Sequence, residues 1–458
     1  MKKFLLLALA SLSILPVWAQ TGKEESNVIK VYDSVVFYDG YRLADNPDSL
    51  LQDGVKRHSC SLYSRKLTDE QLDAIGENLN LNVYVEALCD NYDRIGNINI
   101  AFVEKGSESY VPGETDRIEI GRFITPFMNK NKDPKVVPYS YEVSYLSNLL
   151  RDEDLREKYD LWLEFELFGV PYAANQQIRG CADRSDVFAG TLEFVTGSPA
   201  PASKGNVLVP IVIKKPEYIG ANLNNYKREA TDTITKTVKT YTYTVPENVA
   251  DAQLVLITSN HGANDGGEEY NRRKHFVYVD GDLVLTYIPG RDSCEPFRKY
   301  NTQPNGIYGF SPMSDEEWQS FSNWCPGDVI DNRIISLGAY KAGEHKVMIR
   351  VPDAKFRGKQ GDIPVSLYFH GLKEGSFEAG VSEVAPTKGS VEVVKRGNLL
   401  YVDTEMDVRS VEVYSQAAEL LHRQWNNNPI SLESYVPGVY VVCVELTDGI
   451  MIAKKVIF

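Results

Sequence analysis

The stretch Leu161-Trp162-Leu163-Glu164-Phe165-Glu166-Leu167-Phe168 decides the fold, because its apolar residues recur at every second position. Side chains of a β-strand point to opposite faces in turn, so the odd-numbered residues form one wholly apolar face that predicts a sandwich core. The opposite face carries two carboxylates between two aromatic rings: Trp162, Glu164, Glu166 and Phe168. A solvated face is one interpretation. A sugar-binding groove is the other, because sugar hydroxyls favour charged acceptors and sugar rings stack on aromatic rings.

Short alternating runs recur along the chain and are bounded by Gly, Pro, Asn and Asp, as at residues 98–102, 237–245 and 346–351. This pattern predicts an all-β protein of the sandwich or barrel class. Helical patterns are confined to residues 142–158 and 68–79, and the latter begins with a capping box formed by Thr68 and Gln71.

Two segments rich in Pro, Ser or Gly, 197–205 and 381–389, predict domain boundaries. They divide the chain into units at 27–197, 206–375 and 389–458. The first two units have the size of antiparallel sandwiches, and the third is small.

The N-terminal residues have the organisation of a secretory signal peptide. Met1-Lys2-Lys3 is basic, residues 4–17 are almost wholly apolar, and Ala19 precedes a polar residue, so we predict a signal peptide at 1–19. Export to the periplasm, the cell surface or the medium follows. The net charge of −14 argues against nucleic acid as a partner, because neutralising phosphates requires a basic surface.

Acidic residues gather in two further segments. The loop Gly266-Gly267-Glu268-Glu269-Tyr270-Asn271-Arg272-Arg273-Lys274-His275 precedes a strand-like run, and Cys89-Asp90-Asn91-Tyr92-Asp93-Arg94 forms a turn between two such runs. Loops on rigid β scaffolds often carry binding and catalytic groups. A solvated hairpin end and a surface ion pair between Asp93 and Arg94 are the alternatives; in a site, Arg94 would hold Asp93 ionised.

Other chemistries find little support in the sequence. The six histidines show no metal-binding spacing, and neither a Gly-x-Ser-x-Gly elbow nor a phosphate-binding loop occurs. The six cysteines are widely spaced without a CxxC, which disfavours structural zinc and, in an exported protein, permits disulfides. Carboxylates are therefore the best candidate acid–base groups.

Four segments, in order along the chain, resemble those of the peptide N-glycosidase F family of Bacteroidetes-type bacteria. They are residues 89–94, Ile120-Gly121-Arg122-Phe123-Ile124-Thr125-Pro126, residues 266–275 and Trp324-Cys325-Pro326-Gly327. The resemblance covers residues 27–372 and implies two eight-stranded antiparallel jelly rolls side by side. The third unit resembles, more loosely, the C-terminal sorting domain of type IX-secreted proteins, a small β-sandwich.

The resemblance implies a peptide-N4-(N-acetyl-β-glucosaminyl)asparagine amidase that needs no metal or cofactor. Such an enzyme releases the intact N-glycan of a glycoprotein or glycopeptide as a glycosylamine and converts asparagine to aspartate. Asp93 matches the principal catalytic acid, Glu269 the second and Glu166 the third, with Glu164 as the alternative to Glu166. We assign substrate binding to Arg94, Tyr92, Glu164, Trp162, Glu268 and Tyr270, and we expect a monomer.

The sequence also departs from the family pattern. Gly267 and Asn271 stand where a disulfide brackets the second acid, and Phe321 replaces an arginine. Tyr92 and Tyr270 replace tryptophans, and residues 173–184 form an insertion, so glycan preference, including tolerance of core fucose, stays open.

The cysteines are expected to form disulfides. We predict a disulfide between Cys294 and Cys325, which would contribute about 3 to 4 kcal/mol on the chain-entropy model. Cys89 has either Cys60 or Cys181 as its partner. Three other functions compete with the amidase. They are a non-catalytic glycan-binding module, a glycosidase that uses two of the carboxylates, and a copper monooxygenase on paired jelly rolls.

Overall fold

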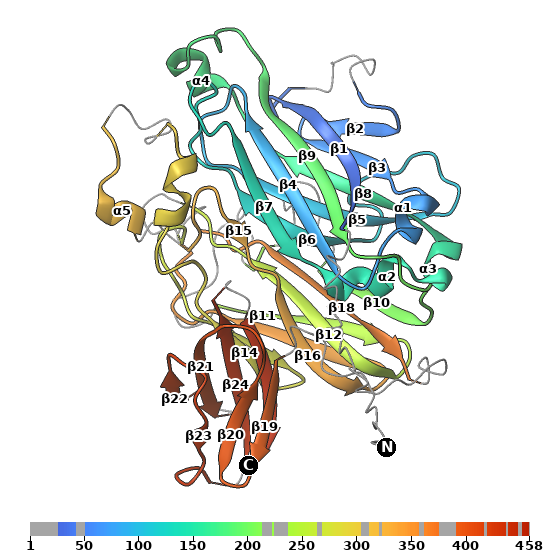
Figure 1. Ribbon diagram of the computed structural model, residues 1–458, viewed down its shortest axis with the longest axis vertical. Coiled ribbons are helices and arrows are strands. Elements are labelled where there is room, and N and C mark those ends of the chain that lie inside the picture. The colour runs from blue at the N-terminus through green and yellow to red at the C-terminus, as the bar shows by residue number, and fades with distance from the viewer. Residues whose placement is uncertain are drawn as a thin grey trace, which may run out of the picture.

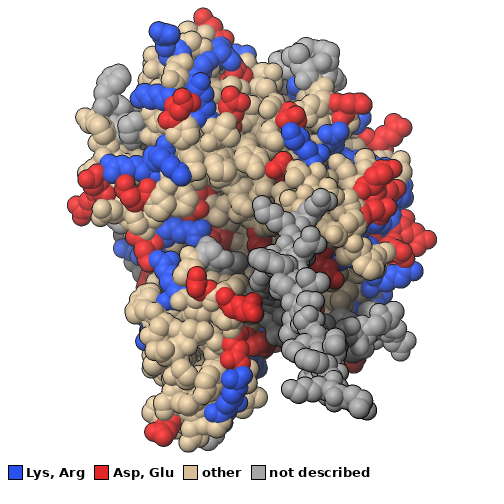
Figure 2. All heavy atoms as spheres, in the orientation of Figure 1, with Lys and Arg blue, Asp and Glu red and all other residues tan. Residues whose placement is uncertain are grey.

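The computed structural model describes residues 26–42, 51–212, 222–223, 237–262, 268–303, 311–319, 323–356, 361–374, 391–415, 419–436, 438–447 and 451–457. The predicted signal peptide at 1–19 and the predicted boundary segment at 381–389 lie outside these ranges. The described part consists mostly of β-strands (Figure 1), which confirms the all-β prediction. None of its helices has the length and apolar character needed to cross a membrane. Acidic and basic side chains are interspersed over the face shown in Figure 2.

The first sandwich contains a four-stranded and a six-stranded sheet. Their strand orders are β1-β9-β4-β7 and β15-β6-β5-β8-β3-β2, with antiparallel neighbours throughout. The strands are β1 Asn27–Tyr38, β2 Val55–Ser59, β3 Leu62–Lys66, β4 Leu79–Ala87, β5 Ile95–Glu104, β6 Arg117–Ile124, β7 Val136–Glu142, β8 Tyr159–Leu167, β9 Asp186–Thr196 and β15 Val329–Ile330. Because β15 comes from the second half of the chain, it joins the two large units at the edge of one sheet.

The apolar face of β8 lies in the core of this sandwich, as its alternation predicts. Phe165 is fully buried and packs edge-on against Phe37 and Tyr32, with ring centroids 4.9 and 5.9 Å apart. Burying such a ring stabilises the fold by roughly 2 to 3 kcal/mol.

Short helices lie between the strands. The predicted capping box is confirmed at α1 (Asp69–Asp73), where the Thr68 hydroxyl accepts from the Gln71 N–H and the Gln71 side chain accepts from the Thr68 N–H. The segment predicted as one helix at 142–158 is broken, because the Asp152 carboxylate accepts from the Leu155 N–H and starts a new helix. The remaining helices are η2 Ser144–Leu146, α2 Ser147–Leu150, α3 Glu153–Lys158, α4 Tyr172–Gln177, η4 Glu295–Tyr300 and α5 Asp315–Gln319.

The second sandwich lies beside the first (Figure 1). One of its sheets has the order β11-β17-β13-β14, and the other begins with β10-β18-β12-β16. The strands are β10 Asn206–Val212, β11 Val238–Val245, β12 Val249–Thr258, β13 His275–Val279, β14 Asp282–Tyr287, β16 Arg333–Tyr340, β17 Gly343–Arg350 and β18 Val365–Lys373.

The third unit continues a sheet of the second sandwich. Its strand β25 pairs in parallel with β16, with Ile334 opposite Ile452, so the sheet runs on as β16-β25-β24-β21-β22. Tyr414 and Cys443 of this unit belong to the same buried cluster as the core of the second sandwich. The strands are β19 Glu392–Arg396, β20 Leu399–Asp403, β21 Val408–Ser415, β22 Leu420–Gln424, β23 Ile430–Ser431, β24 Val439–Leu446 and β25 Met451–Ile457. The division into three units stays a prediction.

Two disulfides are present in the described part of the chain. Cys294 and Cys325 are bonded, with their Cα atoms 5.3 Å apart. The other bond joins Cys89 to Cys181, and Cys60 is a buried free thiol. Cys181, in the inserted segment, is thus the partner of Cys89.

Candidate active site

Asp93 lies in the turn between β4 and β5, which a buried carboxylate holds in place. Asp90 accepts from the backbone N–H of Tyr92 at 2.9 Å, from that of Val170 at 2.7 Å and from Arg94 Nε at 2.7 Å. The guanidinium of Arg94 also covers the Tyr92 ring, 4.7 Å from its centroid. Asp93 is therefore presented, partly exposed, by a turn that the bonds of Asp90 hold in place.

Glu269 belongs to the loop that follows β12 in the second sandwich. Its Oε2 accepts from the Gly262 N–H at 3.1 Å, and its backbone carbonyl accepts from the Asn323 side chain. Asn323 in turn accepts from the Asn260 N–H at 2.8 Å. Two segments of the second sandwich, residues 260–262 and Asn323, therefore hold this acidic residue.

The two sandwiches bring Asp93 and Glu269 close enough for their charges to interact. Burial, followed by the charge of Glu269, raises the pKa of Asp93 to about 8, although Arg94 acts in the opposite direction. Burial also raises the pKa of Glu269. Burial and Glu269 thus outweigh the expected effect of Arg94, whose guanidinium also binds Asp90.

Asp362 is an acid of this junction that the sequence analysis missed. It precedes β18 and forms a two-bond backbone pair with His261, at 2.8 and 3.0 Å, next to the Gly262 N–H that holds Glu269. Burial, followed by Glu269, raises the pKa of Asp362 to about 7. Its segment, Gly361-Asp362-Ile363-Pro364, belongs to no motif, so only the tertiary pairing reveals it.

Arg122, in the segment 120–126, connects the two sandwiches. Its fully buried guanidinium is bonded to both carboxylate oxygens of Glu119, at 3.0 and 2.8 Å. It also donates to Ser259 Oγ at 2.9 Å and to the Pro364 carbonyl at 3.0 Å, both in the second sandwich. At the end of the same strand, Thr125 Oγ1 accepts from the Arg94 N–H at 2.8 Å. The segment therefore positions acids on both sides of the junction.

Glu166 lies in the same cross-strand row as Arg122. Asn97 of β5 is opposite Arg122 of β6 on one side and opposite Glu166 of β8 on the other. Directly opposed residues share a face of the sheet, so Glu166 faces the same way as Arg122, two strands away. Glu166 as a whole is 4% exposed.

Three residues that we assigned to substrate binding are enclosed instead. Glu164 is fully buried in an ion pair with Arg117 and accepts from the Tyr110 hydroxyl at 2.7 Å, and Trp162 packs against the same tyrosine. Tyr110 thus covers the part of the predicted sugar-binding face that carries Trp162 and Glu164.

The third of these residues, Glu268, is also fully buried. It accepts from Arg273 Nε at 2.9 Å and from the Lys355 N–H at 2.7 Å. Its neighbour Tyr270, by contrast, is 49% exposed.

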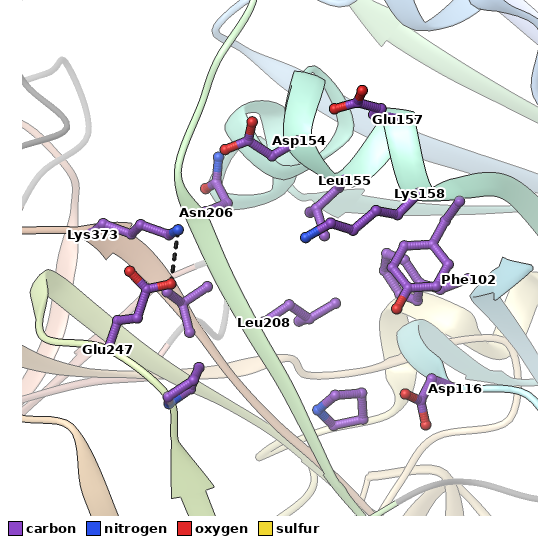
Figure 3. A pocket seen from close by; sticks show the side chains of 14 residues that line it. Phe102, Asp116, Asp154, Leu155, Glu157, Lys158, Asn206, Leu208, Glu247 and Lys373 are labelled. Carbon is purple, nitrogen blue, oxygen red and sulfur yellow. Dashed lines mark ion pairs between the residues drawn. The ribbon is translucent and has the colours of Figure 1, made fainter. Parts of the chain in front are cut away.

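In the described ranges, neither the cavity between the sandwiches nor a metal-binding group adds to the predicted site. A cavity of about 290 Å³ lies between the sandwiches, lined by residues that include Phe102, Glu157, Lys158 and Lys373 (Figure 3), and none of the predicted site residues lines it. No set of three or more His, Cys, Asp or Glu residues in the described ranges is arranged to hold a metal ion. Gly267 and Phe321, two of the departures noted above, fall outside those ranges.

Comparison with solved structures identifies proteins of similar fold. The structure of PNGF-II in space group P21 is 18% identical, with a TM-score of 0.53, and the match covers 77% of this chain and 66% of that one. The C2 form is 17% identical, with a TM-score of 0.52 and the same coverage. PNGase F, a glycosylasparaginase from Flavobacterium meningosepticum, is 17% identical, with a TM-score of 0.47, covering 76% of this chain and 96% of that one. This chain thus spans just under two thirds of the length of PNGF-II.

Family models match most of the two large units. Residues 28–181 match the model described as Peptide-N-glycosidase F, N terminal, and residues 225–370 match Peptide-N-glycosidase F, C terminal. A search of curated proteins found no match. The two models together span more than half of the sequence, and the chain belongs to the peptide-N-glycosidase F family.

Proposed function

We propose that the protein hydrolyses the amide bond that joins an N-glycan to the asparagine side chain of glycoproteins or glycopeptides. The intact glycan leaves as a glycosylamine, and asparagine becomes aspartate. The observation that carries the proposal is the coupling of Asp93, from the first sandwich, to Glu269, from the second, at their junction. Membership of the peptide-N-glycosidase F family supports the same reaction.

Hydrolysis of an amide needs a base for the attacking water and an acid for the departing nitrogen. Asp93, with a pKa of about 8, is suited to both tasks in turn. Its carboxylate takes a proton from water as the C–O bond forms, and it returns that proton to the nitrogen as the C–N bond breaks. The new aspartate side chain then ionises in solution.

The remaining residues bind and orient the substrate. Glu269, fixed by the Gly262 N–H, positions the water and the first sugar. Glu166, behind Asn97, holds a water between the sheet and that sugar, while Tyr92, Arg94 and Tyr270 contact the substrate. Trp162 and Glu164 are left out of this proposal because Tyr110 covers them, and Glu268 is left out because it is paired with Arg273.

Mass spectrometry of a glycopeptide incubated with the protein tests the proposal. The wild type and Asp353→Asn, which changes an exposed acid, should both release the whole glycan with an asparagine-to-aspartate mass shift, and Asp93→Asn should not. A product that retains one sugar on the peptide would instead indicate a glycosidase. Unchanged glycopeptides across several glycan types would indicate a binding module.

We further infer that the chain is exported by its N-terminal signal peptide and is a monomer. The third unit would be a type IX sorting domain, and the two large units would be jelly rolls, the first with additional strands at its sheet edges. The two disulfides fit an oxidising compartment. N-terminal sequencing of the exported protein tests cleavage after Ala19, and light scattering tests the monomer. Deletion of residues 389–458 should prevent arrival outside the cell, whereas Tyr414→Ala, which disturbs the core shared with the second sandwich but keeps the third unit, should still be exported.

A further inference from the structure

A cleft of about 390 Å³ lies between the second sandwich and the third unit. Strand β14 contacts β24 and β25 there, and Figure 1 shows β14 beside β24. The loops that follow β12 and β14 line the cleft on one side, and β21, β22 and β24 line it on the other. Its volume is in the range of small-molecule sites, about 300 to 1,000 Å³. Asp93, Glu166 and Glu269 do not line it, so the cleft is separate from the proposed reaction centre.

Polar contacts tie the two walls of the cleft together. Lys274 Nζ of the second sandwich donates to the Tyr414 hydroxyl of the third unit at 2.8 Å. Arg409 of the third unit is ion-paired with Asp292 of the second sandwich. The parallel pairing of β16 with β25 fixes the same two units to each other. A ligand would therefore enter a preformed site, which lowers the ordering cost of binding.

The cleft is rich in positive charge although the chain has a net charge of −14. Six cationic and four acidic side chains line it. The cations are Arg272, Lys274, Arg291, Arg333, Arg409 and Arg423. Each of the four acids is ion-paired with an arginine of the same cleft. The acids are thus already compensated, and an excess of positive charge remains.

Two of these cations are fixed in place by uncharged groups. Arg272 Nε donates to the Pro289 carbonyl at 2.9 Å, and Lys274 donates to the Tyr414 hydroxyl. Among the described residues, neither cation forms an ion pair with a carboxylate. Arg272 is also exposed, so an anion from solvent can reach it.

Arg333 is the most deeply buried cation of the cleft, with a side chain 3% exposed. Its guanidinium lies 3.9 Å from the centroid of the Tyr287 ring, and it donates to the Asp331 carbonyl at 3.2 Å. Its Nη2 is 3.9 Å from the Asp331 carboxylate, which is too far for a hydrogen bond. Within the part of the chain that the structure describes, its Nε has no hydrogen-bond partner. Because a buried charge is costly unless it is paired and hydrogen-bonded, an anionic ligand here would supply what Arg333 lacks.

An aromatic ring completes the lining of the cleft. Trp425 is 66% exposed, and the guanidinium of Arg423 lies 5.8 Å from the centroid of its ring. Sugar rings stack on exposed aromatic rings, whereas a bare inorganic anion gains nothing from one. The combination of an exposed indole with uncompensated cations therefore favours a ligand that is both a sugar and an anion.

We propose that this cleft binds an acidic sugar, with its carboxylate at Arg333 and Arg272 and its ring against Trp425. Guanidinium groups bind carboxylates through charge-assisted, often paired hydrogen bonds. The acidic sugar comes either from the end of an N-glycan or from a separate acidic polysaccharide. The inference goes beyond the proposed amide hydrolysis and does not depend on it.

Isothermal titration calorimetry with three saccharides tests the proposal. They are a released disialylated N-glycan, the same glycan after removal of sialic acid, and trigalacturonate. The proteins are the wild type, Arg272→Gln, Trp425→Ala and the control Arg396→Gln, which changes an exposed arginine of the third unit outside the cleft. Both replaced cleft side chains are exposed, so these variants should fold.

The wild type and Arg396→Gln should bind an acidic saccharide about tenfold or more tightly than the desialylated glycan, and added NaCl should weaken this binding. Arg272→Gln and Trp425→Ala should each weaken it by about fivefold or more. Binding of the sialylated glycan would identify the end of an N-glycan as the source, and binding of trigalacturonate alone would identify a separate polysaccharide.

Two results would overturn the proposal. One is that neither acidic saccharide binds more tightly than the desialylated glycan, and the other is that both cleft variants bind like Arg396→Gln. The three saccharides contain no asparagine amide, so either result would leave the amidase standing. A protein that binds the acidic saccharide but hydrolyses no glycopeptide would support the cleft and refute the amidase.

Discussion

Replacing Asp93 by asparagine should stabilise the folded protein at alkaline pH even though it abolishes the proposed activity. Burial and Glu269 raise the pKa of this carboxyl from 3.8 to about 8. Between these two values the folded protein retains a proton that the unfolded chain has released. The unfolding free energy of the wild type therefore falls as pH rises through this window, and the loss is complete above about pH 8.

The size of the effect follows from the width of the window. From about pH 5 to pH 8, linkage at ~1.4 kcal/mol per pH unit sets an upper bound of about 4 kcal/mol. Because the carboxyl is partly exposed, solvent screens part of this interaction, and we expect about 2 kcal/mol. The neutral Asp93→Asn side chain removes this loss, so the variant should gain stability over the wild type as pH rises.

Urea denaturation at pH 5, 7 and 9, followed by tryptophan fluorescence and circular dichroism, measures the difference. Asp353→Asn is the matched control, since its side chain is exposed and should show no comparable gain. A stability difference between Asp93→Asn and the wild type that stays constant from pH 5 to 9 would refute the reasoning.

Four further predictions concern activity, packing and covalent links. The kcat/KM of the wild type should rise with pH around a midpoint near 8, because the base must be ionised; a flat profile from pH 6 to 9 would contradict this assignment. Arg122→Met should cost about 3 to 5 kcal/mol in urea denaturation, since a buried carboxylate loses its partner, and Arg122→Lys should cost less. Tyr414→Ala should remove about 3 to 5 kcal/mol of packing and lower the unfolding midpoint of the whole chain; a separate early transition would argue against the shared core. Joint replacement of Cys294 and Cys325 by serine should cost about 3 to 4 kcal/mol by the same assay, and no loss would exclude a stabilising bond.

The alternating stretch 161–168 shows what a local sequence pattern can and cannot predict. Its period of two predicts which residues share a face, and Phe165 indeed lies in the core. The same pattern also led us to interpret Trp162 and Glu164 as an open groove. Tyr110 and Arg117, from other parts of the chain, cover that face, and the alternation of one strand contains no information about its cover.

The adjacent acids Glu268 and Glu269 also differ in a way that the sequence does not predict. In the sequence they are equivalent neighbours in one loop, and only the resemblance favours the second. In the structure, Glu268 is buried against Arg273, while Glu269 accepts from Gly262 at the junction of the sandwiches. Their difference comes from partners that the fold brings to them.

The sequence by itself determined the β architecture and the capping box at Thr68, and through its motifs it pointed to Asp93 and Glu269 as candidate acids. These features depend on side-chain periodicity and on hydrogen bonds within a few residues, or on short motifs that can be read directly. Only the tertiary structure decided that the Asp362 backbone lies beside the loop that holds Glu269 and that Arg122 forms hydrogen bonds to both sandwiches. It also decided the raised pKa of Asp93. The proton affinity of a carboxyl depends on burial and on nearby charges, and here those charges come from residues far apart in the chain.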